Sequence, residues 1–175
     1  MSINAYTKSY KKNLKKKKLE LLEPAENFVR MYKFFIKKKK LKCLDFGIGD
    51  GRHVEFLLKK RNKVIGTDIS QEAINLTKKR LKKINGINLK NLDLYFFNNE
   101  SYINKFIFHK IDLIVCWETI HWLGNFYKIK KIIKNFSNSL TKSGKIFITF
   151  PSEDHYLLDR KNLKNYYSYK IKDKL

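Results

Sequence analysis

The chain has 175 residues with a hydrophobic content of 43%, which suffices for one globular domain and excludes a disordered chain. No apolar run reaches the ~20 residues that cross a bilayer, and the N-terminus lacks the apolar segment of a secretory signal. We therefore expect a cytoplasmic protein without a membrane span. The formal net charge of +23 raises the question of a polyanionic partner.

The basic side chains are overwhelmingly lysine, and asparagine and isoleucine are also abundant while alanine and proline are scarce. A coding sequence rich in A and T produces this bias without any selection for binding. Proteins that read phosphates and bases favour arginine, whose planar fork matches those groups. The composition therefore disfavours a nucleic-acid partner without excluding one.

The two cysteines, Cys43 and Cys116, both lie inside apolar runs, and neither belongs to a CxxC or Cys/His motif. This setting predicts buried, reduced thiols and no metal site or disulfide.

Two regions are expected: a basic N-terminal arm or helix over residues 1–23, and one domain over residues 24–175. A helix should follow Pro24, because apolar residues recur there at helical spacing. Its predicted buried face consists of Phe28, Tyr32, Phe35 and Ile36.

From residue 41 onward, strands and helices alternate. Strands are expected at residues 41–46, 63–68, 91–97, 111–117 and 145–150, with Ser143 and Gly144 turning the chain into the last one. The first intervening helix has Val54, Leu57, Leu58 and Arg61 on one side. The second has Ile74, Thr77, Leu81 and Ile84 at helical spacing after an N-cap at Ser70. The last has one face that consists of Ile129, Ile132, Ile133, Phe136 and Leu140. This order predicts an α/β fold, doubly wound and mostly parallel, with helices on both faces.

The strongest local motif is LDFGIGDGRH at residues 44–53, a strand end followed by three glycines and a helix. A dinucleotide fingerprint would place its third glycine where Arg52 stands, and that glycine permits close packing of helix on strand. Asp45 precedes the loop and would repel a pyrophosphate, whereas it would attract an ammonium or sulfonium group. The loop therefore favours a cationic nucleoside cofactor.

Asp68 closes the second predicted strand, 17 residues after Gly51. An acidic residue at this point accepts hydrogen bonds from ribose hydroxyls in nucleotide-binding α/β folds. The alternative is that Asp68 caps the helix that begins near Ser70.

In this order, LDFGIGDG, GTDIS, IDLIVCWETIHWL and SNSLTKSGKIFITF resemble the motifs of class I (Rossmann-like) S-adenosylmethionine-dependent methyltransferases. The resemblance covers residues ~41–150. The GRH, HW and TFPSEDH segments resemble the small-molecule and tellurite-resistance-like branch of that family. S-adenosyl-L-methionine is the cofactor that the resemblance implies.

The resemblance also implies roles for single residues. Asp45 and Gly47 would hold the methionine portion of the cofactor, and Gly49 and Gly51 would line it. Asp68, with Ile69 beside it, would bind the ribose. The remaining cofactor contacts implied are Asn99 or Glu100 at the adenine, and Cys116 and Trp117 along the fourth strand.

Methyl transfer from a sulfonium needs alignment of the acceptor, and a base only where the acceptor loses a proton. His121 and Glu118 are the candidate bases, with His155 as a third. His121 could equally shape the pocket, and Glu118 could begin a helix.

The resemblance favours a small-molecule acceptor. One alternative is an RNA or protein methyltransferase that uses the basic surface. The other is a non-catalytic, truncated domain, because only residues 151–175 follow the last predicted strand. Members of the family add a helix and an antiparallel strand pair at this point, and we expect that this domain could lack them.

Overall fold

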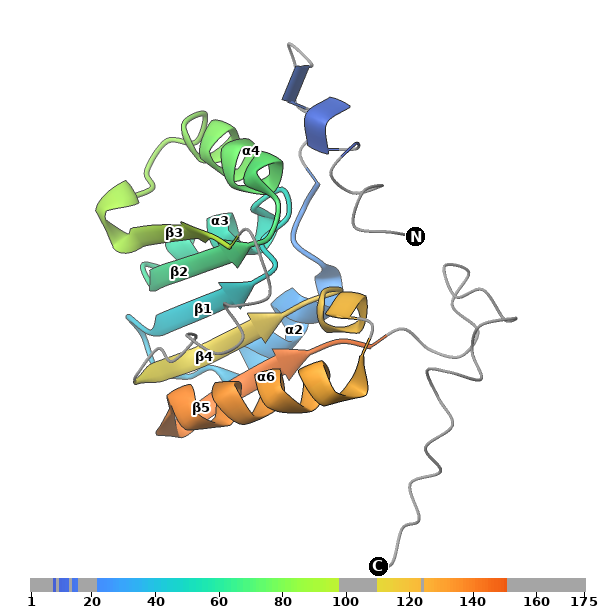
Figure 1. Ribbon diagram of the computed structural model, residues 1–175. Helices are drawn as coiled ribbons and strands as arrows, with labels where there is room; N and C mark the ends of the chain where they lie inside the picture. Colours follow the sequence, from blue (N-terminus) through green and yellow to red (C-terminus); the bar gives the residue numbers. More distant parts are fainter. Residues whose placement is uncertain are drawn as a thin grey trace, which may run out of the picture.

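The computed structural model describes residues 8, 10–12, 14–15, 22–97, 110–123 and 125–150. These residues form a sheet of five parallel strands in the order β3-β2-β1-β4-β5, with helices on both faces (Figure 1). The strands are β1 (Lys42–Phe46), β2 (Lys63–Asp68), β3 (Leu92–Phe96), β4 (Ile111–Cys116) and β5 (Leu140–Ile148). The Rossmann-like α/β fold that the sequence predicts is confirmed.

The helices fall where the apolar periodicity predicts them. They are α2 (Glu26–Phe35), α3 (Arg52–Lys59), α4 (Gln71–Leu81) and α6 (Phe126–Ser139), with short 3-10 turns η1 (Leu89–Asn91) and η2 (Ile120–Leu123). Ser70 is the N-cap of α4 as expected, because its side chain accepts a hydrogen bond from the Ala73 amide at 3.2 Å. Asn125 caps α6 in the same way.

The strand order reverses between β1 and β4. After β1 the chain adds β2 and β3 on one side, and then returns to place β4 on the other. In open α/β sheets, ligands bind beyond the carboxyl ends of the strands at such a reversal. The loops that follow β1 and β4 lie side by side there, since Thr119 Oγ1 donates to the Gly47 carbonyl at 3.4 Å.

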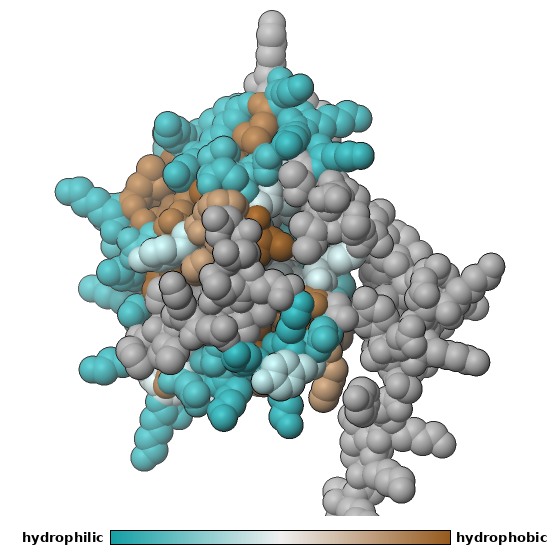
Figure 2. Space-filling model, viewed as in Figure 1, coloured by the Kyte–Doolittle hydropathy of each residue, from teal (hydrophilic) through white to brown (hydrophobic). Residues whose placement is uncertain are grey.

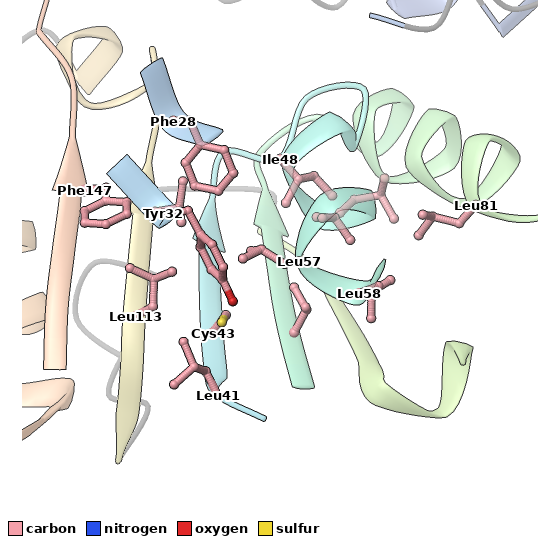
Figure 3. Close-up of a cluster of buried hydrophobic side chains, with 14 residues drawn as sticks. Phe28, Tyr32, Leu41, Cys43, Ile48, Leu57, Leu58, Leu81, Leu113 and Phe147 are labelled. Atoms are coloured by element: carbon pink, nitrogen blue, oxygen red, sulfur yellow. The ribbon is translucent and has the colours of Figure 1, made fainter. Parts of the chain in front are cut away.

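One face of the sheet packs against α2, α3 and α4 (Figure 3). Phe28 and Tyr32 from α2 and Leu57 from α3 meet Cys43 and Leu113 from the strands in one buried cluster. Figure 3 shows these side chains pointing into the space between helices and sheet. A Phe28 ring with no exposed surface contacts the rings of His53, Trp117 and Phe147, so it joins this layer to the carboxyl ends of the strands.

The other face packs against α6. Phe46 and Cys116 on the strands meet Ile132 and Phe136 on the helix in a second buried cluster. The two cysteines are buried and free, and they lie in different clusters on opposite faces of the sheet. A disulfide between them is therefore excluded by the sheet that separates them.

Residues assigned to the helix faces lie at or beyond the helix end in α2, α3, α4 and α6, and Ile133 is exposed within α6. Phe35, Arg61 and Ile133 are exposed, and Ile84 follows the end of α4. Arg61 follows the end of α3 in a left-handed conformation. Leu140 is the first residue of β5 and not the last turn of α6. Apolar spacing continues past the point where a helix stops, so it does not locate the stop.

The expected turn at Ser143 and Gly144 is also wrong, because both residues lie within β5. The pairing jumps from Ile111 with Leu140 to Leu113 with Lys145, so an irregularity of β5 absorbs residues 141–144. A Cβ at Gly144 would lie 2.9 Å from the Ile111 carbonyl oxygen. Glycine thus permits a close approach of the two strands where a turn was expected.

Candidate functional site

The glycine loop, residues 47–51, is held against β2 by backbone hydrogen bonds. The Gly47 and Ile48 amides both donate to the Thr67 carbonyl, at 2.8 and 3.1 Å. The Gly49 amide donates to Asp68 Oδ2 at 3.0 Å. The loop therefore has a set position relative to the end of β2, which brings the two strongest sequence signals into direct contact.

Glycine is required in this loop for both conformation and space. Gly47, Gly49 and Gly51 have φ values of 83°, 56° and 82°, in the left-handed region that other residues avoid. A Cβ at Gly47 would collide with the Thr119 side chain, and one at Gly51 would lie 2.8 Å from Thr77 on α4. The loop thus touches both the β4 loop and α4 through positions that tolerate no side chain.

Asp45 is a carboxyl group buried beside the loop. It is 1% exposed, and its Oδ2 has no hydrogen-bond partner among the described residues. Burial, together with the Asp68 carboxylate, raises the pKa of Asp45 to about 8, although Arg52 acts in the opposite direction. A buried polar oxygen without a partner is costly, so this site favours a ligand that brings a donor or a positive charge.

Asp68 has contacts at the start of α4 and also retains the capacity to bind a ribose. Its Oδ1 accepts from the Ser70 amide at 2.8 Å and its Oδ2 from Gly49, while Ser70 itself caps α4. Burial raises the pKa of Asp68, and these backbone hydrogen bonds oppose that rise. A carboxylate accepts about four hydrogen bonds, so capacity for ribose hydroxyls remains. Ile69 beside it is 39% exposed and available to a ligand.

The loop after β4 carries Glu118 in a left-handed conformation, with φ of 51°. Its amide donates to Thr149 Oγ1 at 2.7 Å, which fixes the backbone against the end of β5. Its exposed carboxylate pairs with Arg52 at 2.9 Å. Strained non-glycine residues cluster at functional sites, and this one lies where the β1 and β4 loops meet.

Cys116 and Trp117 lie at the end of β4, as expected. The Cys116 thiol is fully buried in the cluster that faces α6, and burial raises its pKa well above the ordinary value. Its side chain therefore faces α6 and leaves the backbone for a cofactor contact. Trp117 packs on Phe28 and His53, with ring centroids at 5.8 Å in both contacts.

The two described histidines near the site differ in environment. His53 is buried, accepts a hydrogen bond from the Ala25 amide at 3.4 Å, and has its pKa lowered to about 3 by burial and by Arg52 and Arg80. It is a neutral residue that packs against Phe28 and Trp117. His121 lies on η2, directly after the β4 loop, with its ring 4.8 Å from that of Trp122.

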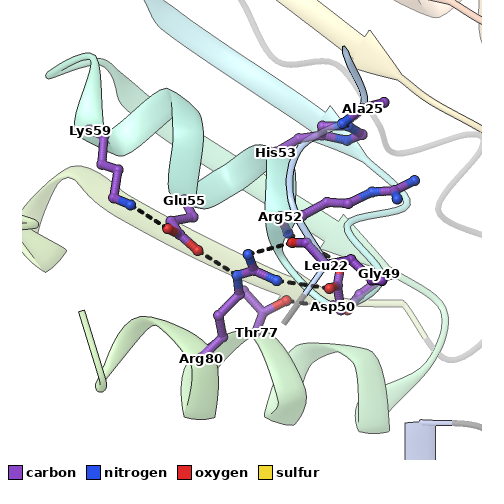
Figure 4. A network of polar contacts seen from close by, with 10 residues as sticks. All are labelled: Leu22, Ala25, Gly49, Asp50, Arg52, His53, Glu55, Lys59, Thr77 and Arg80. Atoms are coloured by element: carbon purple, nitrogen blue, oxygen red, sulfur yellow. Dashed lines mark hydrogen bonds and ion pairs between the residues drawn. The ribbon is translucent and has the colours of Figure 1, made fainter. Parts of the chain in front are cut away.

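Arg80 is a site residue that the sequence analysis missed (Figure 4). It is 1% exposed, and its guanidinium donates to Glu55 on α3 at 2.6 Å, to Asp50 in the glycine loop at 2.8 Å, and to the Leu22 carbonyl at 2.7 Å. One side chain thereby joins the loop, two helices and the segment before α2. Acidic residues at 50 and 55 were the signal, but nothing local relates them to position 80.

The described part of the N-terminal arm lies near the same loop. A Cβ on Gly49 would be 3.0 Å from the Tyr10 hydroxyl. Lys11 pairs with Glu72 at 3.4 Å, and Lys79 Nζ donates to the Leu14 carbonyl at 2.7 Å. The described residues of the arm thus contact the glycine loop and both the first and the last turn of α4.

Asn99 and Glu100, the adenine candidates, lie outside the described residues, as do His109 and His155. Within the ranges that are described, no group of His, Cys, Asp and Glu could hold a metal ion. None of the described helices is long and apolar enough to cross a membrane.

These residues fit the cofactor that the resemblance implies. The partnerless Asp45 oxygen suits a cationic methionine portion, and Asp68 offers acceptors at the end of β2. The described residues therefore include polar groups of the kinds that a methionine portion and a ribose need.

The sequence profile of a methyltransferase-domain family matches residues 44–146. No curated protein matches the chain significantly. Among solved structures, an S-adenosylmethionine-dependent methyltransferase from Clostridium acetobutylicum is 25% identical, with a TM-score of 0.50 over 60% of this chain and 40% of that one.

Two further structures share the fold over more of the chain. A SAM-dependent methyltransferase from Methanosarcina mazei is 22% identical, with a TM-score of 0.61 over 81% of this chain and 65% of that one. The N-methyltransferase NodS from Bradyrhizobium japonicum, in complex with S-adenosyl-L-homocysteine, is 18% identical, with a TM-score of 0.61 over 81% of this chain and 70% of that one.

Proposed function

This chain belongs to the methyltransferase-domain family that residues 44–146 match, and from that premise we propose that it methylates a small molecule with S-adenosyl-L-methionine. The observation that carries the proposal is the buried Asp45 carboxyl, with one oxygen left without a partner beside a three-glycine loop. The small-molecule, tellurite-resistance-like branch stays part of the proposal.

The residues divide into a cofactor half and an acceptor half. Asp45 and the glycine loop bind the methionine portion, and Asp68 with Ile69 binds the ribose. Asn99 or Glu100 contacts the adenine. When bound, the cofactor supplies a methyl group already activated on a sulfonium, so the chain's main work is alignment.

The acceptor half is the loop after β4. Glu118 and His121 are the groups that take a proton from an acceptor that must lose one. The left-handed backbone at Glu118 points its amide at Thr149 and leaves its carboxylate exposed beside Arg52. Cys116 and Trp117 border the cofactor between the two halves.

The charge around the site supports a small acceptor over RNA. In the described loops that follow β1, β2, β4 and β5 there is no lysine, and Arg52, which begins α3, is paired with Glu118. A nucleic-acid substrate would be held by cations around the mouth of the site. The described residues of the arm contribute Lys8, Lys11, Lys12 and Lys15, of which Lys11 pairs with Glu72.

Calorimetric titration with S-adenosylmethionine and S-adenosylhomocysteine tests the proposal. We expect micromolar binding by the wild type, and a loss of roughly 10- to 100-fold in Asp68→Ala, because hydrogen bonds to a charged acceptor are removed. Asp93→Ala is the matched control, since Asp93 is an exposed carboxylate on the neighbouring strand β3.

A folded wild type that binds neither compound would contradict the proposal and favour the non-catalytic alternative. Equal loss in Asp68→Ala and Asp93→Ala would remove the assigned ribose contact. Binding established in this way justifies a screen of acceptors, in which methylated RNA as the product would overturn the small-molecule part.

A further inference from the structure

Positive charge is segregated between the two edges of the sheet. The segments that lead into the strands are strongly basic: residues 37–42 contain five lysines, and residues 59–63 contain three lysines and an arginine, without any acidic residue in either. Three of these lysines pair with carboxylates on neighbouring elements: Lys38 with Asp112, Lys59 with Glu55 and Lys63 with Asp93. The remaining cations still outnumber the carboxylates at this edge. These segments lie at the amino ends of β1 and β2, to the left in Figure 1, opposite the candidate site. Figure 2 shows hydrophilic side chains projecting along that margin.

The two basic segments are held side by side by one buried amide. Asn62 has no exposed surface; its Oδ1 accepts from the Leu41 amide and its Nδ2 donates to the Tyr32 hydroxyl, each at 2.9 Å. The Lys63 amide also donates to the Leu41 carbonyl at 2.8 Å. The Lys42 amide donates to Asp112 Oδ2 at 3.0 Å, which brings Lys110, immediately before β4, beside the first segment. The fold therefore builds one basic patch from residues 37–42 and 59–63 and Lys110, which we call the amino-edge patch.

The backbone conformation at three of these cations argues that the patch is not only a result of the lysine-rich composition. Lys40, Arg61 and Lys110 have φ values of 58°, 60° and 61°, and they precede β1, β2 and β4. Glycine and asparagine are favoured in this left-handed region. Asparagine has codons as rich in A and T as those of lysine, so codon bias alone would supply it here. A cation is present at all three turns despite that preference.

Large apolar side chains are exposed beside the cations. Phe34 and Phe35, at the end of α2, are 70% and 47% exposed, and their rings lie 4.8 Å apart immediately before the lysine run. Lys37 Nζ lies 6.0 Å from the centre of the Phe34 ring. An aromatic pair that leaves water, flanked by lysines that stay in it, is the arrangement of a protein that rests on a membrane surface.

We propose that the amino-edge patch docks this protein on an anionic lipid surface. Phe34 enters the interface, and the lysines and Arg61 contact headgroup phosphates. The Phe35 ring supports Phe34 from behind, because it also packs on Phe147 of β5 with ring centroids 6.3 Å apart. Lipid fits better than nucleic acid, because the exposed aromatic pair ends a helix and is not spread along a basic groove, and the cations are almost all lysine. The candidate site at the opposite edge then faces the aqueous phase.

Flotation of the full chain with vesicles tests this proposal, using equal parts phosphatidylglycerol and phosphatidylcholine against pure phosphatidylcholine. The key variant is Lys40→Asn/Arg61→Asn/Lys110→Asn, because asparagine suits the left-handed backbone and the fold is retained. Each cation removed from the membrane surface should lower the vesicle partition coefficient about fivefold, so the triple variant should bind about 100-fold more weakly. The control Lys12→Gln/Lys128→Gln/Lys130→Gln removes the same charge elsewhere and should weaken binding far less.

Phe34→Ser adds a readout that charge alone does not move. We expect about a tenfold loss of partition that persists in high salt, because the buried ring and not the charge is removed. Equal losses in the two triple variants would overturn the proposal, as would stronger binding of the wild type to poly(U) RNA than to the vesicles. The proposal does not rest on methyl transfer, and calorimetric binding of S-adenosylmethionine should be unchanged in all three variants.

Discussion

The proposed cofactor half and acceptor half of the site differ in how firmly hydrogen bonds and buried ion pairs hold them. The cofactor half is held by backbone hydrogen bonds, three left-handed glycines and the buried Arg80 network. The acceptor half rests on an exposed ion pair between Arg52 and Glu118 and on one threonine hydroxyl. Precise binding of a common cofactor requires a firmly held half. A loosely held acceptor half allows the side chains around an acceptor to change without loss of the fold.

The largest effect should come from breaking the cofactor half at Arg80. Arg80→Met leaves Asp50 and Glu55 without their shared cation, so we expect a loss of about 3–5 kcal/mol in the free energy of unfolding. Urea denaturation measures it. Arg30→Met is the control, because the Arg30–Glu26 pair is exposed at 74% and 76% and should contribute nothing measurable.

The double variant Arg80→Met/Glu55→Gln separates charge from packing. Hydrogen bonds from Lys59 and Arg80 lower the pKa of Glu55, against the effect of burial, so the glutamine should recover part of the lost stability. If Arg80→Met is no worse than Arg30→Met, the cofactor half does not depend on this network.

A smaller effect, opposite in sign, is expected at Asp45. The pKa of Asp45 is about 8 in the folded protein and 3.8 in the unfolded chain. Between these two pH values only the unfolded chain releases the Asp45 proton, so the wild type loses stability as pH rises through this window. Below the window both states are protonated, and above it both are ionised. Asp45→Asn should therefore be more stable at pH 7 by about 2 kcal/mol, less than full linkage because relaxation screens buried carboxyls.

Urea denaturation of both proteins at about pH 4 and pH 8 checks the sign, with equal stability expected at the lower value. Calorimetry should show that the same variant binds S-adenosylmethionine more weakly. A variant that gains stability and keeps its affinity would mean that Asp45 is not a cofactor ligand.

The smallest effect is expected in the acceptor half. Glu118→Gly relieves a left-handed backbone and should raise the free energy of unfolding by about 0.5 kcal/mol. Lys40→Gly is matched to it, since the two residues have φ values of 51° and 58°. Cofactor affinity should change less than about threefold, because the exposed Arg52 pair is weak. A larger loss of affinity in Glu118→Gly alone would show that the two halves are not separable.

Local signals were enough to predict much of the cofactor half. The runs at β1, β2 and β4 are continuously apolar because both sheet faces are covered, and glycines and the Ser70 cap mark the turns directly. Arg80 escaped because its partners at positions 22, 50 and 55 become neighbours only through the fold. The start of β5 was not predicted, because a glycine is typical both of a turn and of a strand irregularity.

The single amide of Asn62 has a consequence for the way in which the molecule opens. It bonds the Leu41 amide and the Tyr32 hydroxyl while remaining inaccessible to water, so helix α2 cannot detach without leaving buried polar groups bare. Helix α2 and the pairing of β1 with β2 should then separate from the rest only together, as one cooperative unit. Deuterium should reach the Leu41 amide only when that whole unit opens, which makes this proton a reporter of its stability.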